Sequence, residues 1–447
     1  MLPRHGLADL IAWAREPKRK PMIIRGARQV GKSTFVELLA EAMGLNCVTV
    51  NLERRPELAE LFKSNDPVQI IQLISLQFQQ SITPNKSILF IDEIQAAPEV
   101  LASLRYFYED LPELHVLCAG SLLEFALEAL TFSMPVGRIE YFYLGPMTFD
   151  EFLLALGEQG LLDFLMHYHM NDEIPIAIHQ KLLSLLKTFL IIGGMPEAVQ
   201  AYVSNQDFLM VERVKRSILD TYQDDFSKYS AVQPPYLLRS IFETIPGLIG
   251  QKIKYSQINP NVKSGIIANK IRLLAMAKIM TMVYHSSANG LPLGAQVNQK
   301  IFKLIFLDSG LLSTQLGLSF LDLYKVEELN LVHSGMLAEQ FIGQHLLYMK
   351  PYYEPPHLYY WRREMKSSQA EIDYVISYRQ KIIPIEVKAG KTGTLKSLHL
   401  FMAEKNALLG VRFSSQLPSL VSDSQGKTLL SLPLYMVGQL TRLLSES

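Results

Sequence analysis

The chain has 447 residues, of which 49% are hydrophobic and 19% are charged. This composition excludes a disordered chain, and the length predicts about three domains. The 43 basic and 43 acidic residues cancel, which by itself argues against a polyanionic partner. With two cysteines, Cys47 and Cys118, a disulfide framework is excluded and a reducing, cytoplasmic compartment is expected. Charged residues interrupt the most apolar stretches, so neither a membrane span nor a membrane partner is predicted.

The N-terminal part, residues 1–157, predicts a parallel α/β domain. Short apolar runs typical of strands occur at 22–25, 47–52, 87–91 and 115–119, and a helical pattern follows the first of them at 32–43. Strands that alternate with helical segments are typical of a parallel sheet. The fold class expected for the whole chain is α/β with several domains.

The first predicted strand enters a glycine-containing loop. The loop reads Gly26-Ala27-Arg28-Gln29-Val30-Gly31-Lys32-Ser33, which fits G-x-x-x-x-G-K-[ST], and Thr34 follows it. In this motif backbone N–H groups wrap the phosphates, Lys32 reaches the β and γ oxygens, and the Ser33 hydroxyl binds Mg²⁺. The alternative is an ordinary glycine turn. Because a strand precedes the loop and a helix follows it, we predict that residues 26–34 bind ATP and Mg²⁺.

A second motif follows about 60 residues later. The apolar strand at 87–91 ends in Asp92 and Glu93. Asp92 is predicted to hold Mg²⁺ through water or Ser33, and Glu93 to polarise the water that attacks the γ-phosphate. A strand followed by two acidic residues is more often a surface strand end, but in combination with the phosphate loop it predicts ATP hydrolysis.

Two further polar residues are candidates for the same site. Ser121 follows the strand at 115–119 and is predicted either to contact the γ-phosphate or to cap the next helix. Arg138 is the one basic residue between residues 121 and 180, where nine residues are acidic. It is interpreted either as an arginine finger or as a salt-bridge partner, and both readings stay open.

Residues 158–447 are predicted to form three more regions. These are helical segments at 158–230, a unit at 231–325 and a last unit at 326–447. The second unit has three short helical segments and then two strand-like runs, a layout typical of a winged helix. Residues 244–307 contain no Asp or Glu and eight basic residues, which makes DNA a candidate partner. The alternative is a basic surface that contacts the acidic region 121–180. The basic residues are Lys252, Lys254, Lys263, Lys270, Arg272, Lys278, Lys300 and Lys303.

Several long segments resemble a bacterial and archaeal family of AAA-type ATPases with a C-terminal region of uncharacterised function. In the ATPase part these are RKPMIIRGARQVGKST (19–34), SILFIDEIQAAP (87–98), LRYFYEDLPELHVLCAGSLLEFAL (104–127) and PVGRIEYFYLGPMTFDEFL (135–153). In the C-terminal part they are GGMPEAV (193–199), YQDDFSKY (222–229), KLIFLDSGLL (303–312), EIDYVI (371–376) and IPIEVKAG (383–390). The resemblance implies an ATPase domain, a helical lid, a winged helix and a C-terminal fold similar to PD-(D/E)xK nucleases. Ser33 stands where the family commonly has Thr, which preserves the hydroxyl.

Charged residues near the C-terminus can be placed by pairing two strand-like runs, 371–377 and 381–388. A hairpin centred between Arg379 and Gln380 puts Asp373 opposite Glu386 and Glu371 opposite Lys388, all on one face. Two facing carboxylates can bind Mg²⁺ or Mn²⁺, and a nearby lysine can activate water for phosphodiester hydrolysis. The alternative is a solvated face of paired charges. Arg-Gln is not a typical two-residue hairpin turn. In the nuclease-like pattern Glu339, on the preceding helix, completes the metal ligands with Asp373 and Glu386.

Taken together, the sequence predicts an ATP-hydrolysing, DNA-associated protein with a metal-dependent nuclease-like domain. The alternative is a nucleotide-dependent switch or scaffold whose nuclease-like fold is not catalytic, and an oligomer is compatible with both. The zero net charge is a cancellation, because outside residues 244–307 the chain has 35 basic and 43 acidic residues. Fields act within about 10 Å at physiological salt, so net charge does not exclude a polyanionic partner.

Overall fold

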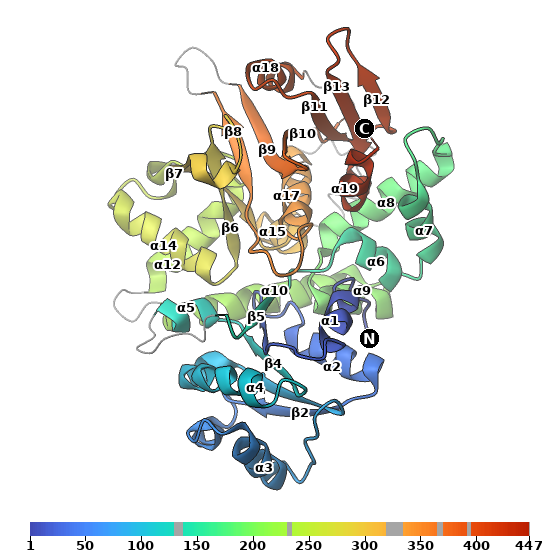
Figure 1. Ribbon diagram of the computed structural model, residues 1–447. Helices are drawn as coiled ribbons and strands as arrows, with labels where there is room; N and C mark the ends of the chain where they lie inside the picture. The colour runs from blue at the N-terminus through green and yellow to red at the C-terminus, as the bar shows by residue number, and fades with distance from the viewer. Residues whose placement is uncertain (129–136, 230–234, 319–333, 364–369, 391–394, 447) are drawn as a thin grey trace. The chain divides into compact units, whose positions relative to one another are not determined.

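The computed structural model describes residues 1–128, 137–229, 235–318, 334–363, 370–390 and 395–446 (Figure 1). The chain divides into two compact units. Unit 1 comprises residues 1–145, 276–278 and 350–355, and unit 2 comprises the rest. The expected boundaries at 230 and 325 lie outside the described residues, and the division of the chain at 157 stays a prediction. Among the described residues, no helix is both long enough and apolar enough to cross a membrane.

Unit 1 is built on a parallel sheet, as predicted. Its five described strands lie in the order β2-β3-β4-β1-β5, and every neighbouring pair is parallel. The apolar residues of β3 and β4 are buried, and helix α2 packs on β2, β3 and β4. The four predicted strands are confirmed, and β5 is an addition. The strands are β1 (Met22–Arg25), β2 (Asn46–Asn51), β3 (Ser87–Asp92), β4 (His115–Gly120) and β5 (Glu140–Tyr143).

Apart from α1, which precedes β1, the described helices of unit 1 connect successive strands. One N-terminus is fixed by sequence: Asp66 accepts hydrogen bonds from the N–H groups of Val68 and Gln69, and Pro67 fits the first turn of α3. The helices are α1 (Leu7–Ala14), α2 (Lys32–Met43), η1 (Pro56–Phe62), α3 (Pro67–Phe78), η2 (Ile94–Ala96), η3 (Pro98–Ser103), α4 (Leu104–Asp110) and α5 (Leu123–Glu128).

Unit 2 begins with a helical region, which confirms the helical periodicity predicted for 158–230 over the described residues 158–229. The break at Gly193-Gly194 has a packing cause, because a Cβ on Gly193 would clash with the Asp308 carboxylate, whose Oδ2 accepts a hydrogen bond of 2.6 Å from the Gly194 N–H. The helices are α6 (Phe149–Ala155), α7 (Gln159–His167), α8 (Ile176–Ile192), α9 (Pro196–Asn205), α10 (Phe208–Asp224), α11 (Phe226–Tyr229), α12 (Pro235–Thr244), η4 (Ile245–Leu248), α13 (Tyr255–Ile258) and α14 (Ser264–Met276).

The rest of unit 2 forms a mixed sheet in which eight described strands lie in the order β12-β13-β11-β10-β9-β8-β6-β7 (Figure 1). Helix α17 packs on β7 and β10, and α18 packs on β9, β10 and β11. The strands are β6 (Met280–Ser286), β7 (Val297–Phe306), β8 (Tyr359–Arg362), β9 (Glu371–Tyr378), β10 (Lys381–Val387), β11 (Leu409–Ser414), β12 (Ser419–Ser422) and β13 (Thr428–Pro433). The helices here are η5 (Leu293–Gln296), α15 (Ser309–Gln315), α17 (Ser334–Leu347), α18 (Lys396–Glu404), η6 (Leu434–Gln439) and α19 (Leu440–Leu444).

The ribbon expected to form the wing of a winged helix, β6 and β7, is part of this larger sheet. β6 pairs with β7 on one side and with β8 on the other, where Tyr284 and His285 lie opposite Tyr359 and Tyr360. A strand edge with unpaired backbone groups is a favourable place for another strand to add. The ribbon is therefore joined to the C-terminal strands, and the winged helix stays a prediction.

The β9–β10 hairpin has the register that the sequence predicts. Tyr378 lies opposite Lys381, and the ladder continues to Tyr374 opposite Ile385. Both turn residues have positive φ, 43° at Arg379 and 63° at Gln380. This is the backbone of a two-residue turn that matches strand twist, adopted here without the usual Asn-Gly pair.

Candidate functional site

The residues of the two predicted phosphate motifs meet at the carboxyl edge of the unit 1 sheet. Asn51 at the end of β2 lies opposite Asp92 at the end of β3, and Arg25 at the end of β1 lies opposite Gly120 at the end of β4. All four strands are parallel, so the loops that follow them share one edge. This edge is where open α/β sheets bind ligands.

The loop between β1 and α2 has the backbone that a phosphate cradle needs. Gly31, immediately before α2, has φ 88°, and Gln29 has φ 64°. A Cβ on Gly26 would lie 2.3 Å from the Leu144 carbonyl oxygen, so this position requires glycine. The loop leads directly into the N-terminus of α2, whose free N–H groups favour anions.

Lys32 is folded back into this loop. Its Nζ donates hydrogen bonds to the carbonyl oxygens of Gly26 (3.1 Å) and Ala27 (2.8 Å), and 8% of the residue is exposed. Burial lowers the pKa of Lys32 to about 8, although the nearby carboxylates of Glu93 and Asp92 oppose this shift. The ammonium is therefore held by neutral partners that a phosphate group can replace.

Ser33 and Asp92 form an oxygen pair. Ser33 Oγ donates a hydrogen bond of 3.2 Å to Asp92 Oδ2, and Asn51 Nδ2 donates another of 3.2 Å to the same oxygen. Burial and the charge of Glu93 raise the pKa of Asp92. Hydroxyl and carboxylate oxygens are the ligands that Mg²⁺ prefers, so this pair fits the expected ion.

Glu93 has an uncommon backbone conformation, and its side chain is fixed by a hydrogen bond. Its φ is 51°, which is uncommon for a residue other than glycine and typical of functional positions. Its Oε2 accepts a hydrogen bond of 2.5 Å from Gln95 Nε2. On the other side of Gln95, a Cβ on Gly120 would lie 2.3 Å from Gln95 Oε1. Glycine at the end of β4 thus leaves room for the side chain that contacts Glu93.

Ser121 and Arg138 have different surroundings. Ser121 Oγ is buried and has no hydrogen-bond partner among the described residues, so no capping bond to α5 is present there. Arg138 Nε donates a hydrogen bond of 3.0 Å to Glu109 Oε1, and its guanidinium lies 5.8 Å from the ring centre of Tyr108. Arg138 is thus a salt-bridge partner in this structure, which is one of the two roles that the sequence leaves open for it.

Sequence reasoning missed three residues that support this edge: Asn51, Gln95 and Arg4. Arg4 donates to the carbonyl oxygens of Val30 (2.9 Å) and Gly145 (2.8 Å), and so braces the phosphate loop. Asn51 carried a usable signal, because it is a polar residue at the end of a predicted strand, as Asp92 is. For Arg4, which is 26 residues before Val30, no local pattern indicates the contact.

A second group of charged residues lies in unit 2. Lys303 on β7 is 2% exposed, and its Nζ lies 2.6 Å from Glu371 Oε1, 3.1 Å from Glu339 Oε1 and 3.8 Å from Asp373 Oδ1. We call Glu339, Glu371, Asp373 and Glu386 the carboxylate cluster. Burial alone would lower the pKa of Lys303, but Glu339, Asp373 and Glu371 raise it above its usual range.

Glu386 and Lys388 form the other end of this group. Lys388 Nζ lies 2.5 Å from Glu386 Oε1, while Glu386 Oε2 is buried without a hydrogen-bond partner. Asp373 Oδ2 accepts a hydrogen bond of 2.7 Å from the Val387 N–H, so the Asp373 carboxylate lies at the end of β10. Burial and the charge of Asp373 raise the pKa of Glu386.

The predicted pairs Asp373–Glu386 and Glu371–Lys388 lie beyond the β9–β10 ladder, which ends at Tyr374 and Ile385, and Glu371 lies opposite Arg362 on β8. The described residues also contain no group of three or more His, Cys, Asp or Glu side chains arranged to hold a metal ion. An ammonium already lies among the carboxylates, so these residues do not fit the divalent metal that the nuclease resemblance implies.

The basic window is less exposed than its charge suggests. Lys303 and Lys270 are buried, and Lys278 Nζ lies 3.0 Å from Glu124 Oε1. The remaining five basic residues are partly or fully exposed: Lys252, Lys254, Lys263, Arg272 and Lys300. The window therefore supplies five positive charges, not eight, to a surface.

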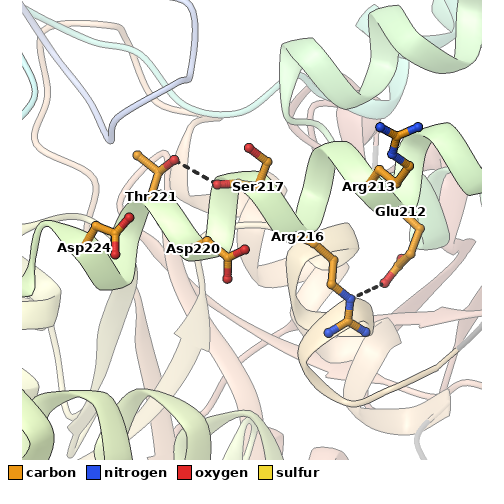
Figure 2. A pocket seen from close by; sticks show the side chains of 7 residues that line it. All are labelled: Glu212, Arg213, Arg216, Ser217, Asp220, Thr221 and Asp224. Carbon is orange, nitrogen blue, oxygen red and sulfur yellow. Dashed lines mark hydrogen bonds and ion pairs between the residues drawn. The ribbon is translucent and has the colours of Figure 1, made fainter.

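A pocket of about 510 Å³ lies on α10, and Figure 2 shows the side chains that line it. Some of its side chains form hydrogen bonds within α10. Arg216 Nε donates to Glu212 Oε1 (3.2 Å), and Thr221 Oγ1 donates to the Ser217 carbonyl oxygen (2.8 Å). Among the described residues, every lining residue comes from α10, and Thr314 on α15 donates a hydrogen bond of 3.0 Å to Glu212 Oε2. The lining residues are Glu212, Arg213, Arg216, Ser217, Asp220, Thr221 and Asp224.

Three family models match separate stretches of the chain. Residues 18–153 match a family model described as an AAA domain. Residues 183–322 and 334–435 match two models described as domains of unknown function, DUF8612 and DUF4143. The chain therefore carries an AAA P-loop ATPase domain followed by two domains of unknown function. Neither of the two C-terminal models is described as a nuclease or as a winged helix.

Two solved structures are similar in part. The structure of C. elegans PCH-2 is 13% identical, with 47% of this chain and 67% of that chain covered and a TM-score of 0.29. The structure of the Aeropyrum pernix ORC2 protein, in ADPNP and ADP complexes, is 14% identical, with 71% and 94% covered and a TM-score of 0.36. A search of curated proteins gave no match.

Proposed function

We propose that the protein binds Mg²⁺ and ATP at residues 26–34 and hydrolyses ATP, with Glu93 positioning the attacking water. The observation that carries this proposal is the meeting of Lys32, Ser33, Asp92 and Glu93 at one edge of the parallel sheet, within the AAA domain. Each of these side chains has a separate task in phosphoryl transfer.

Binding starts at the phosphate loop. The two carbonyl oxygens that hold Lys32 Nζ are neutral, so the β and γ phosphate oxygens are stronger partners for the ammonium. N–H groups at the start of α2 face the same place. Ser33 and Asp92 would hold the ion, which would neutralise part of the phosphate charge. Ser121 Oγ, buried and unpartnered, is assigned to the γ-phosphate.

Hydrolysis requires a positioned water. The Glu93 carboxylate follows Asp92 directly and is oriented by Gln95. Water oxygen forms a bond to the γ-phosphorus, the bond from that phosphorus to the bridging oxygen breaks, and ADP leaves with the electron pair. The water proton passes toward Glu93. Such positioning contributes about 100-fold or more to the rate.

The test combines binding and turnover. Fluorescent ATP binding and phosphate release are measured with Mg²⁺ in the full chain, in Lys32→Ala and in the control Lys86→Ala, an exposed lysine of unit 1. We expect Lys32→Ala to lose both activities and Lys86→Ala to keep both. Wild-type binding without turnover would support the alternative, a nucleotide-dependent switch or scaffold.

Association with DNA is a second candidate function. It is favoured by one observation, the five exposed or half-buried basic residues within a window that has no acidic residue. Phosphate contacts from lysine and arginine weaken steeply with salt. We expect labelled duplex DNA to bind at low salt, and a charge-reversed Lys254, Lys263 and Arg272 variant to lose binding while Lys86→Glu does not. No binding of the wild type at low salt would remove this function.

Metal-dependent cleavage at Asp373, Glu386 and Lys388 is not part of this proposal. We derive no step of it, because the ammonium of Lys303 lies among the carboxylates that would hold the metal. An oligomeric assembly stays a prediction.

A further inference from the structure

We propose that the ammonium of Lys303 is the resident cation of the carboxylate cluster. In this arrangement the lysine, and not a divalent metal, compensates the charge of Glu339, Glu371 and Asp373, while Lys388 pairs with Glu386. The proposal concerns unit 2 alone and is independent of ATP hydrolysis.

The fold brings the lysine to the cluster from a distant strand. Lys303 comes from β7, Glu371 and Asp373 from β9, and β6 and β8 lie between these strands in the sheet order. Glu339 comes from α17, which packs on β7 and β10. The contact of 2.6 Å between Lys303 Nζ and Glu371 Oε1 therefore ties the ribbon to the C-terminal strands.

The geometry is that of an ammonium with three partners. An ammonium has three N–H donors, and three different carboxylates lie within 3.8 Å of Lys303 Nζ. The ring of Tyr360, with its centre 5.1 Å away, adds a cation–π contact. A lysine that is 2% exposed requires such compensation, since a buried unpaired charge is costly.

Neighbouring residues restrict the position of Glu339 within the carboxylate cluster. The backbone at Gly250 lies so near that a Cβ there would be 2.7 Å from Glu339 Oε2. Gly250 also has φ 73°, a second reason for glycine at this position. The side chain of Tyr374 donates a hydrogen bond of 2.9 Å to the Glu339 carbonyl oxygen. Glu339 is thus fixed next to the lysine from several sides.

The charge of the lysine has a direct consequence for metal binding. A divalent ion among Glu339, Glu371 and Asp373 would lie close to the ammonium, and like charges at this distance repel. Removal of the lysine charge leaves three carboxylates without a counterion. Lys303→Met, which replaces the four-carbon stem by an uncharged chain of the same number of heavy atoms and removes the ammonium, is therefore expected to convert the cluster into a cation site.

Thermal unfolding of the full chain at neutral pH tests this inference. Wild type, Lys303→Met and the control Lys300→Met, an exposed position on the same strand, are each measured in EDTA, Mg²⁺ and Mn²⁺ without nucleotide. We expect the wild type and Lys300→Met to have the same midpoint in all three conditions. Lys303→Met should unfold several degrees lower in EDTA and regain at least half of that loss in Mn²⁺.

A second measurement serves if Lys303→Met does not fold. Mn²⁺ binding to the folded chain is followed by electron paramagnetic resonance in an Asp92→Asn background, which removes the metal ligand of the nucleotide site. We expect no tight Mn²⁺ in this protein. A tightly bound Mn²⁺ that persists there, or a Lys303→Met variant that responds to Mn²⁺ no more than the wild type, would overturn the proposal.

Discussion

The side-chain amide of Gln95 donates a hydrogen bond of 2.5 Å to Oε2 of Glu93. Glu93 itself has a left-handed backbone, with φ 51°, at the end of β3. Gln95 is in turn close to Gly120 at the end of β4, where a side chain would collide with it. The orientation of the Glu93 carboxylate, which is proposed to position the water, therefore depends on β4 as well as on β3.

Replacement of Gln95 should slow turnover more than it weakens binding. Because the side-chain amide of Gln95 donates its hydrogen bond to Glu93, we expect Gln95→Ala to lower kcat about 10-fold while KM for ATP stays within about twofold, as for a lost hydrogen bond to a charged group. Steady-state phosphate release measures both constants, with the exposed Gln80→Ala as the matched control. A rise in KM with unchanged kcat would show that Gln95 acts on binding instead.

The pKa of Lys32 predicts proton uptake when ATP binds. Burial lowers this pKa from 10.5 to about 8, so between these values free Lys32 is partly neutral. The negative phosphates favour the ammonium and raise the pKa, so binding takes up a proton and the affinity falls as pH rises above 8. Calorimetry in two buffers with different ionisation enthalpies measures the uptake. Lys32→Arg, which stays protonated, should show none, and equal heats for the wild type in both buffers would contradict the assignment.

Removal of Arg138 should have a small effect. Its guanidinium is paired with Glu109 at a partly exposed surface, and such pairs contribute little. We expect Arg138→Ala to change kcat by less than about twofold, whereas loss of an arginine finger costs about 1,000-fold or more. Arg105→Ala, which removes the other arginine that contacts Glu109 Oε1, is the matched control. A large loss of kcat in Arg138→Ala alone would restore the finger assignment.

His345 predicts a loss of stability in acid. Its Nε2 accepts a hydrogen bond of 2.9 Å from the Phe149 N–H, its Nδ1 donates to the Phe341 carbonyl oxygen (2.8 Å), and burial lowers its pKa from 6.5 to about 4. Between these values the unfolded state binds more protons, so the free energy of unfolding falls as pH decreases. The loss approaches about 3 kcal/mol at the pKa of the folded state.

Urea unfolding of the wild type and of His345→Gln at several pH values between 6.5 and 4 measures this contribution. Glutamine keeps a donor and an acceptor without a titrating ring. We expect the wild type to lose stability more steeply than the variant across this range. Parallel curves for the two proteins would show that His345 is not the responsible group.

Local geometry could be predicted from the sequence where it depends on the residues of one short segment. The phosphate loop, the strand that ends in Asp92 and Glu93, and the register of the β9–β10 hairpin all follow from spacing within short stretches. The hairpin shows the limit of turn statistics, because Arg379 and Gln380 adopt positive φ although neither is a usual residue there. The register of this hairpin therefore follows from the pairing of β9 with β10 and not from the type of its turn residues.

Contacts between distant segments could not be predicted in this way. Lys303 was assigned to a basic surface, yet it is buried against Glu339, 36 residues away, and against Glu371, which is farther still. The charge of a segment gives no information on which side of a sheet each lysine lies. The contact between Asn51 and Asp92 required the strand order β2-β3, which the motifs leave open.

The most direct test of the account is the separation of ATP binding from ATP hydrolysis at Glu93. Binding of labelled ATP and release of phosphate are measured with Mg²⁺ in the wild type, in Glu93→Gln and in Glu99→Gln, an exposed residue of the same region. We predict that Glu93→Gln binds ATP as the wild type does and releases phosphate about 100-fold more slowly, while Glu99→Gln is unchanged. Phosphate release by Glu93→Gln at the wild-type rate would contradict the proposed role of Glu93.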